Sequence, residues 1–535
     1  MTRFDDILPE IGDRGPYQVL LLIVLSFVKF FAAFQTVAVV FTAGRMDFQC
    51  AESGNESSSS WQQQVASNWT EPAVDRCYRL NGSEACNVWV FNSTSGPFES
   101  SWRSQFSLVC SREKLVNLCS TLYMLGLLIG STGYGALSDH WGRLRAACAA
   151  TINVWVAGIA LAFSPSVEVY AALRFLCGLG SSGILSVCNA MMAESVTQRY
   201  RLTAVLLGTN GWNIALCVCS IIAFGIRSHW KLELTLAGPA ILSIPLLLLL
   251  GESPRWLLAK NRPDDANRVC QRIARINCRR PPACFDEDVR RVCRTLIDQQ
   301  GSHPNAGLID LLRSPTMRIP TLLLWNNFFA SSMVYYGLIL STGTLSGNIY
   351  LTFLLGSAVG VPASAFSIIT AHIIGRPLLF SLVYFLSSAC MFTIAFLLGN
   401  PEFGTLVVAL AITGRFFSTA SFDTSWAYSG ELFPTLVRNV GMGSSSTAAR
   451  VGGILAPLIN ILGEVWKPLP FIIFASVSLL TAFLALLLPE TKGAHLPESL
   501  KDADKEYVKP KVQRLFEGNR GGLSDARGMQ VEVKM

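Results

Sequence analysis

Long apolar stretches alternate with short polar segments along most of the chain. The first stretch begins near Tyr17, and the last one ends at Pro489. A helix needs about 20 apolar residues to cross a bilayer, and 535 residues hold roughly twelve such stretches with their loops. We therefore predict an all-α membrane protein with twelve transmembrane helices. Because no small-residue cleavage site follows the first stretch, we predict a retained anchor and not a signal peptide.

The polar segments divide the chain into six parts. The first three are the N-terminus with the first helix (1–43), a glycosylated extracellular loop (44–113) and the rest of the N-terminal six-helix half (114–254). The last three are a cytoplasmic loop (255–318), the C-terminal six-helix half (319–491) and a charged cytoplasmic tail (492–535). The composition of the tail predicts disorder.

Composition and charge support this organisation. The chain is 51% hydrophobic and 15% charged, with a mean hydropathy of +0.41, which is typical of polytopic membrane proteins. Thirteen Lys or Arg residues lie between Arg255 and Arg318, and they contribute much of the net charge of +7. The positive-inside rule makes this segment cytoplasmic, so the charge does not indicate binding to nucleic acid.

The loop after the first helix combines two features of extracellular segments. It holds four N-x-S/T sequons, at Asn55, Asn68, Asn81 and Asn92, and four cysteines, Cys50, Cys77, Cys86 and Cys110. Sequons are used only outside the cytoplasm, and an even cysteine count there indicates disulfides. We predict a glycosylated, disulfide-bonded loop with both chain termini in the cytoplasm. Three disulfide connectivities are open, and the spacings fit no zinc site.

The two halves of the chain repeat each other. Four features of the first half recur 233 to 241 residues later. The pairs are Gly142-Arg143 with Gly375-Arg376, Arg174-Phe175 with Arg415-Phe416, Glu194 with Glu431, and Glu252 with Glu490. A parallel repeat of two six-helix halves is typical of transporters that rock about a site at the repeat interface.

Two ionisable residues occupy positions where the hydrocarbon core disfavours charge. Counting about 1.5 Å per residue, Asp423 lies roughly 12 Å along its helix from Glu431, and Arg450 lies roughly 18 Å from Arg438. Each costs about 2.5 to 3.5 kcal/mol at the bilayer centre, so such residues usually face a partner or a watery cavity. We interpret the pair as the floor of a solute cavity. The alternative is a structural ion pair that joins the two helices.

Several motifs together resemble the organic-ion transporters of the major facilitator superfamily, which carry cations, anions and zwitterions such as carnitine. They are the glycosylated first loop, D-H-W-G-R at Asp139–Arg143, E-S-P-R-W-L-L at Glu252–Leu258, Y-Y-G at Tyr335–Gly337 and G-E-L-F-P-T-L-V-R-N at Gly430–Asn439. The resemblance covers nearly the whole chain. It implies the major facilitator fold and alternating access.

The resemblance also assigns roles to residues. Arg450 matches an arginine of anion and carnitine carriers, whereas Asp423 falls where cation carriers have an acid. Ser364 stands where some anion carriers have a second lysine. Lys29 adds a positive charge to the cavity, or else it snorkels or packs between helices. The predicted substrate-binding residues are Arg450, Asp423, Phe422, Ser446, Tyr335, Tyr336, Asn327, Trp212, Asn213, Arg415, Thr36 and Lys29. The predicted gating residues are Asp139, Arg143, Glu194, Glu431, Arg438, Glu252 and Arg255.

These features predict a polyspecific plasma-membrane transporter of small organic anions or zwitterions resembling carnitine and betaine. We expect no enzymatic chemistry, metal or cofactor, because the chain has no phosphate-binding glycine loop, metal cluster or nucleophile constellation. The partners are a small organic ion and membrane lipid, with an exchanged or co-transported ion left open. The alternatives are an organic cation transporter, a sugar porter and a non-transporting receptor.

Overall fold

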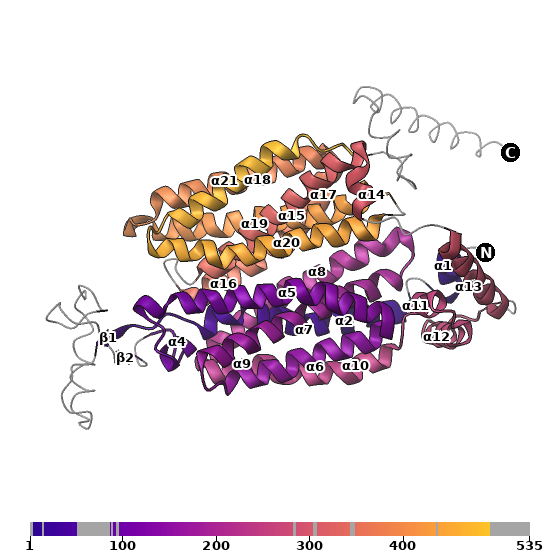
Figure 1. The fold of residues 1–535 in the computed structure, drawn as a ribbon, viewed down its shortest axis with the longest axis horizontal. Coiled ribbons are helices and arrows are strands. Elements are labelled where there is room, and N and C mark those ends of the chain that lie inside the picture. The colour runs from indigo at the N-terminus through magenta and orange to yellow at the C-terminus, as the bar shows by residue number, and fades with distance from the viewer. Residues whose placement is uncertain are drawn as a thin grey trace. The chain divides into compact units, whose positions relative to one another are not determined.

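The computed structural model describes residues 4–12, 15–50, 77, 86, 89–92, 96–281, 285–302, 308–342, 348–434 and 437–492. The predicted disordered tail lies outside these residues. The chain forms two compact helical units (Figure 1). The N-terminal unit comprises Met1–Cys293, Leu338–Ala358 and Pro457–Val465, and the C-terminal unit comprises Arg294–Gly337, Val359–Ala456 and Trp466–Met535.

The N-terminal unit holds the first six membrane stretches. They are α2 (Pro16–Thr42), α5 (Lys114–Trp141), α6 (Arg143–Ala162), α7 (Val167–Glu194), α8 (Gln198–Gly225), and the sixth stretch formed by α9 (His229–Ala237), η2 (Gly238–Leu242) and α10 (Ser243–Leu250). The sixth stretch changes to a 3₁₀ turn where Pro239 lacks the amide N–H that an α-helix needs. The unit also includes α16 (Ile349–Ala358), which packs on α8.

The remaining stretches lie largely in the C-terminal unit. They are α15 (Pro315–Ser341), α17 (Gly360–Ile374), α18 (Arg376–Leu397), α19 (Gly404–Leu432), α20 (Arg438–Ile461) and α21 (Leu469–Ala485). The helix α17 continues from α16, and the 3₁₀ turns η4 (Pro401–Phe403) and η5 (Leu462–Glu464) precede α19 and follow α20. Counting α16 with α17, the described residues contain twelve membrane-length helical stretches, as the apolar pattern predicts. Eight meet strict criteria of length and apolarity, and Asn210–Gly225 and Leu469–Ala485 are shorter apolar helices.

The basic segment 255–318 contains short helices. They are α11 (Pro254–Ala259), α12 (Pro263–Ile276), α13 (Phe285–Ser302) and α14 (Leu308–Arg313). The N-terminal helix α1 (Phe4–Ile11) packs against α12 beside the membrane helices of the N-terminal unit (Figure 1).

Asn277 ties this segment to the first membrane helix. Its side-chain amide donates to the carbonyls of Ile11 and Gly12, each at 2.9 Å, and to Gln18 at 3.2 Å. Its carbonyl oxygen accepts the backbone N–H of Tyr17 at 2.9 Å. One buried side chain thus satisfies backbone groups at the end of α1 and in the first turn of α2, where N–H groups lack intrahelical partners.

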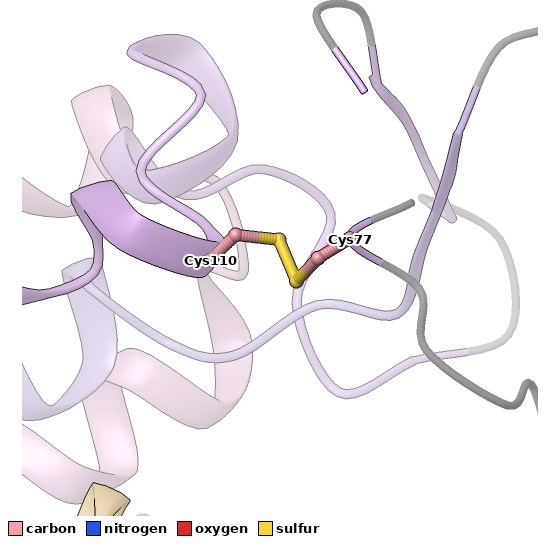
Figure 2. The surroundings of a disulfide bond; sticks show 2 residues. All are labelled: Cys77 and Cys110. Atoms are coloured by element: carbon pink, nitrogen blue, oxygen red, sulfur yellow. A yellow bond between two sulfur atoms is a disulfide. The ribbon is translucent and has the colours of Figure 1, made fainter. Parts of the chain in front are cut away.

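The extracellular loop contains a small sheet and a short helix. Strands β1 (Phe48–Cys50) and β2 (Trp89–Phe91) pair antiparallel, and α4 (Trp102–Gln105) and η1 (Cys110–Arg112) precede α5. Cys77 and Cys110 form a disulfide (Figure 2), and Cys86 is also disulfide-bonded. Of the three connectivities that the spacing left open, the Cys77–Cys110 bond excludes two, and the side chain of Cys50 lies outside the described part of the structure.

The structure disfavours one of the four predicted glycosylation sites. Asn92 is 7% exposed, and its backbone N–H donates to the carbonyl of Asp47 at 2.9 Å. A glycan needs an accessible side-chain amide, so the folded loop leaves little room for one at Asn92. The other three sequons lie outside the described residues.

We therefore expect the sequon variants to behave differently. Asn92→Gln should leave the glycosidase-dependent mass shift unchanged, whereas replacing Asn55, Asn68 and Asn81 together should abolish it. Electrophoresis with and without glycosidase measures both. A remaining shift in the triple variant that disappears when Asn92 is also replaced would show that Asn92 carries a glycan.

Candidate functional site

A charge cluster braces the N-terminal unit around the turn between α5 and α6. The guanidinium of Arg143 pairs with Asp139 at 2.6 Å and with Glu194 at 2.9 Å. Glu252 accepts the backbone N–H groups of Arg143 at 2.9 Å and Leu144 at 3.1 Å. A carboxylate is favourable here because the first N–H groups of α6 lack partners and the helix dipole is positive at this end. Burial raises the pKa of Glu252, against the opposite effect of its backbone hydrogen bonds.

The C-terminal unit builds the same cluster from the repeated residues. The guanidinium of Arg376 makes a two-pronged contact with Glu431, at 2.8 and 3.0 Å. Glu490 accepts the backbone N–H of Arg376 at 3.2 Å at the start of α18. Glu252 and Glu490 therefore cap equivalent helices in the two halves, which supports the internal repeat read from the sequence.

The clusters contain two residues outside the predicted gating set. Glu431 pairs with Arg376, and the Nε of Arg438 donates to the carbonyl of Phe433 at 3.2 Å. Arg376 and Glu490 occupy the places that Arg143 and Glu252 occupy in the first half, and only the repeat indicated them. Arg255 lies in α11, immediately after the turn that carries Glu252.

A glycine precedes the capped helix in each half. Gly142 has a φ of +113° and Gly375 a φ of +87°, and a Cβ at either position would overlap the Glu252 or Glu490 carboxylate. We expect Gly142→Ala and Gly375→Ala to lower the melting temperature by similar amounts. Backbone strain at such a φ costs about 1 to 3 kcal/mol, and steric overlap adds about 1 to 3 kcal/mol.

Gly399 provides a matched control for this pair. It has a φ of +121°, and a Cβ there would meet no atom within 4 Å. Gly399→Ala should therefore show the backbone strain without the overlap, and its melting temperature should fall by less. Thermal unfolding of the purified protein in detergent measures all three variants. Equal losses at the three positions would contradict a role for the two carboxylates.

In the C-terminal unit, the two residues that the sequence placed on a cavity floor have different partners. Asp423, on α19, is 4% exposed and accepts a hydrogen bond from the Ser364 hydroxyl of α17 at 2.5 Å. Arg450 lies on α20 and is half-buried. Among the described residues, no ion pair joins Asp423 to Arg450. The structure therefore does not support the alternative that the two residues exist to neutralise each other.

Arg450 instead belongs to an aromatic group formed by α15 and α19. It interacts with the hydroxyl of Tyr336, and its Nε is buried without a hydrogen-bond partner in the described part of the chain. Tyr335 contacts Tyr336 edge-on at 5.3 Å and stacks with Phe422 at 6.4 Å. Arg415 lies over the Tyr335 ring at 5.8 Å. These five predicted site residues form one chain of contacts, which we call the arginine–tyrosine group.

Other predicted residues of the C-terminal unit have different surroundings. Asn327 is fully buried, and its side-chain N–H donates to the carbonyl of Leu323 at 2.8 Å within α15. Its backbone carbonyl accepts the Tyr384 hydroxyl of α18 at 2.7 Å. Asn327 thus takes part in helix packing. Ser446 is half-buried on α20, four residues before Arg450.

Sequence reasoning missed a polar network beside Asn327. The hydroxyl groups of Ser331 and Tyr384 lie 2.6 Å apart, and those of Ser331 and Ser421 lie 3.1 Å apart. The serine-rich composition of α19 was the available signal, because hydroxyl groups inside a membrane bundle seek partners on neighbouring helices.

The N-terminal unit holds the remaining predicted residues. Lys29 is 3% exposed, and its amine donates to Asn189 at 2.5 Å and to the sulfur of Met192 at 3.4 Å. Lys29 therefore does not snorkel to an interface. The hydroxyl of Thr36 lies 2.7 Å from that of Tyr123. On α8, Asn213 is buried and Trp212 is half-buried.

Arg174 belongs to the same region and was not in the predicted site. It lies 4.6 Å over the Tyr123 ring and donates to the carbonyl of Gln35 at 2.9 Å. Its repeat partner Arg415 also lies over a tyrosine, so the alignment of the two halves could have indicated it. Among the described residues, no group of three or more His, Cys, Asp or Glu side chains could hold a metal ion.

Comparison with known proteins places the chain in a family. Residues 19–501 match the family model described as "Sugar (and other) transporter". An "Organic cation transporter protein" of Drosophila melanogaster is 32% identical, with 98% of each chain covered. "Solute carrier family 22 member 13" of Homo sapiens is 31% identical over 94% of each chain, and "Organic anion transporter 3" of Oryctolagus cuniculus is 30% identical over 95% of each.

A solved structure supports the fold. The xylose transporter XylE of E. coli in an inward-open conformation matches 92% of this chain and 100% of its own, with a TM-score of 0.63 and 14% identity. At that identity the likeness concerns the fold alone.

The family model and the relatives together show that the chain belongs to the sugar (and other) transporter family. It is an organic-ion transporter of the major facilitator superfamily that spans the membrane with twelve helices, and it is not an enzyme.

Proposed function

We propose that the protein carries small organic anions and zwitterions, of the carnitine and betaine type, across the plasma membrane. The observation that carries this proposal is the state of Arg450. Its guanidinium has a buried Nε without a partner among the described residues, and no acid of the described chain pairs with it. A carboxylate on the substrate would supply the missing partner.

The residues around Arg450 suit the rest of such a substrate. Tyr335 and Phe422 present stacked rings beside it. Aromatic faces attract both apolar groups and quaternary ammonium groups. Asp423 supplies a buried negative charge, with Ser364 as its hydrogen-bond donor. A zwitterion could place its carboxylate at Arg450 and its cationic end toward Asp423.

Transport would proceed by alternating access of the two six-helix halves. The Arg143 and Arg376 clusters brace equivalent helix ends of each half, and we propose that they stabilise the outward-facing state as gating elements. We also propose substrate-binding roles for Lys29 and the other predicted residues of the N-terminal unit. The proposal leaves the coupled ion open.

An organic cation transporter is the second candidate, and Asp423 is the observation that favours it. A buried carboxylate without a basic partner among the described residues is a suitable site for a cation. The relatives' names include both cation and anion transporters. The sugar porter is less well supported, because the likeness to the xylose transporter concerns the fold alone.

Uptake of three radiolabelled probes into transfected cells tests the proposal. We expect glycine betaine and benzoate to accumulate above the level of untransfected cells, and tetraethylammonium to accumulate less. Preference for tetraethylammonium would instead identify a cation transporter. Reconstituted vesicles that accumulate none of the probes, although the protein is folded, would contradict the proposal and support a receptor.

A further inference from the structure

A pocket on the N-terminal unit lies outside the transport site. Its volume is about 310 Å³, and it lies between the α5–α6 turn and helices α11 and α12. Trp141, Leu144 and Arg145 form one side. The sequence predicts that this end of the unit faces the cytoplasm, since it carries the basic segment 255–318. We call this cavity the Arg145 pocket.

One of the three arginines that line the Arg145 pocket makes no ion pair among the described residues. On the α12 side, Arg262 and Arg268 both pair with Asp265. Glu252 lines the pocket as well, but its oxygens accept backbone N–H groups at the start of α6. Arg145 is exposed and makes no ion pair within the described residues. The three arginines exceed the two acids by one charge, so the pocket favours an anion.

An exposed tryptophan lines the pocket. Trp141, the last residue of α5, is 55% exposed. Leu248 and Leu249, on the last turn of α10, are also exposed, and the carbonyl of Leu249 accepts a hydrogen bond from Arg272 of α12 at 2.8 Å. Tryptophan is enriched where a protein crosses the boundary between hydrocarbon and head groups. The pocket therefore combines a net positive lining with an apolar side chain suited to the lipid boundary.

We propose that the Arg145 pocket binds the phosphate head group of an anionic phospholipid of the inner leaflet. A guanidinium fork matches phosphate geometry, and basic pockets on the cytoplasmic side of membrane helices suit such head groups. The cavity holds more than a single small ion, because a water molecule occupies about 30 Å³ of liquid. A bound lipid contacts the α5–α6 turn and α12 at once and holds them together beside the Glu252 cap.

Binding of defined lipids to the purified protein in neutral detergent tests this proposal. Native mass spectrometry and thermal unfolding would compare phosphatidylserine, phosphatidylcholine and inorganic phosphate. We expect phosphatidylserine to bind and to raise the melting temperature more than phosphatidylcholine does. Arg145→Gln should weaken phosphatidylserine binding about fivefold, since one basic residue near an anionic surface contributes about that factor.

Two further variants keep the test decisive. Arg280→Gln removes an exposed arginine of the basic segment 255–318 that does not line the pocket, and it should leave binding unchanged. Arg145→Lys retains the charge and should retain much of the binding. Equal weakening by Arg145→Gln and Arg280→Gln would overturn the proposal in favour of diffuse attraction. Inorganic phosphate that binds as tightly as phosphatidylserine would overturn the lipid as the ligand.

Discussion

Replacing Arg450 with alanine is expected to abolish uptake of anions and zwitterions while the protein still reaches the cell surface. The guanidinium has no ion-pair partner among the described residues. Removing it therefore takes no partner away from any described acid, and the variant should fold. Losing one side of a buried, hydrogen-bonded charge pair with the substrate costs about 3 kcal/mol, or a factor of ~100 in affinity. Uptake of labelled benzoate and surface biotinylation together measure the effect.

Arg450→Lys provides the matched control. It keeps the charge but lacks the planar fork that binds a carboxylate through two hydrogen bonds. We expect intermediate uptake, with a raised KM and surface expression equal to that of the parent protein. Undiminished anion uptake in Arg450→Ala would show that Arg450 does not recognise the substrate.

Asp423→Asn is expected to reach the surface normally and to change which substrates are carried. The structure pairs Asp423 with the Ser364 hydroxyl and not with Arg450, and an asparagine can still accept that hydrogen bond. Only the partner of the substrate's cationic group is lost. We expect uptake to shift from betaine toward plain carboxylates by about tenfold, which corresponds to about 1.4 kcal/mol.

Ser364→Ala is the control for Asp423→Asn. It removes the hydrogen bond but keeps the charge, so the preference for betaine over benzoate should be retained. The double variant Asp423→Asn with Arg450→Gln tests the structural ion pair directly. If Asp423→Asn were retained inside the cell and the double variant restored surface expression, the two residues would be structural partners.

The repeat was the part of the fold that the sequence predicted most completely. Glycine, arginine and acidic residues recur at nearly constant separation, and the Gly-Arg and glutamate pairs lie at the ends of equivalent helices. The same chemistry is needed at each of these helix ends, so the same residue types recur in both halves and are recognisable. Arg143, Glu194 and Glu252 were predicted for this reason.

Partners that lie far apart in the sequence were harder to predict. Glu431 and Arg438 are neighbours along the chain, but the guanidinium that contacts Glu431 comes from Arg376, on the preceding membrane helix. Asp423 likewise accepts its hydrogen bond from Ser364, which is 59 residues away in the sequence and on another helix. Helix periodicity shows which residues share a face, whereas the rotation of one helix against another decides which faces meet. Loop spacing likewise leaves disulfide pairing open.

The anchoring role of Asn277 has a practical consequence for measuring motion. The next residue, Cys278, is a free cysteine with an exposed side chain. Because Asn277 holds α12 to the first turn of α2, a fluorophore on Cys278 would follow the first membrane helix closely. A dye there would act as a spectroscopic reporter of the N-terminal helices during turnover. Asn277→Ala should loosen that connection and broaden the signal.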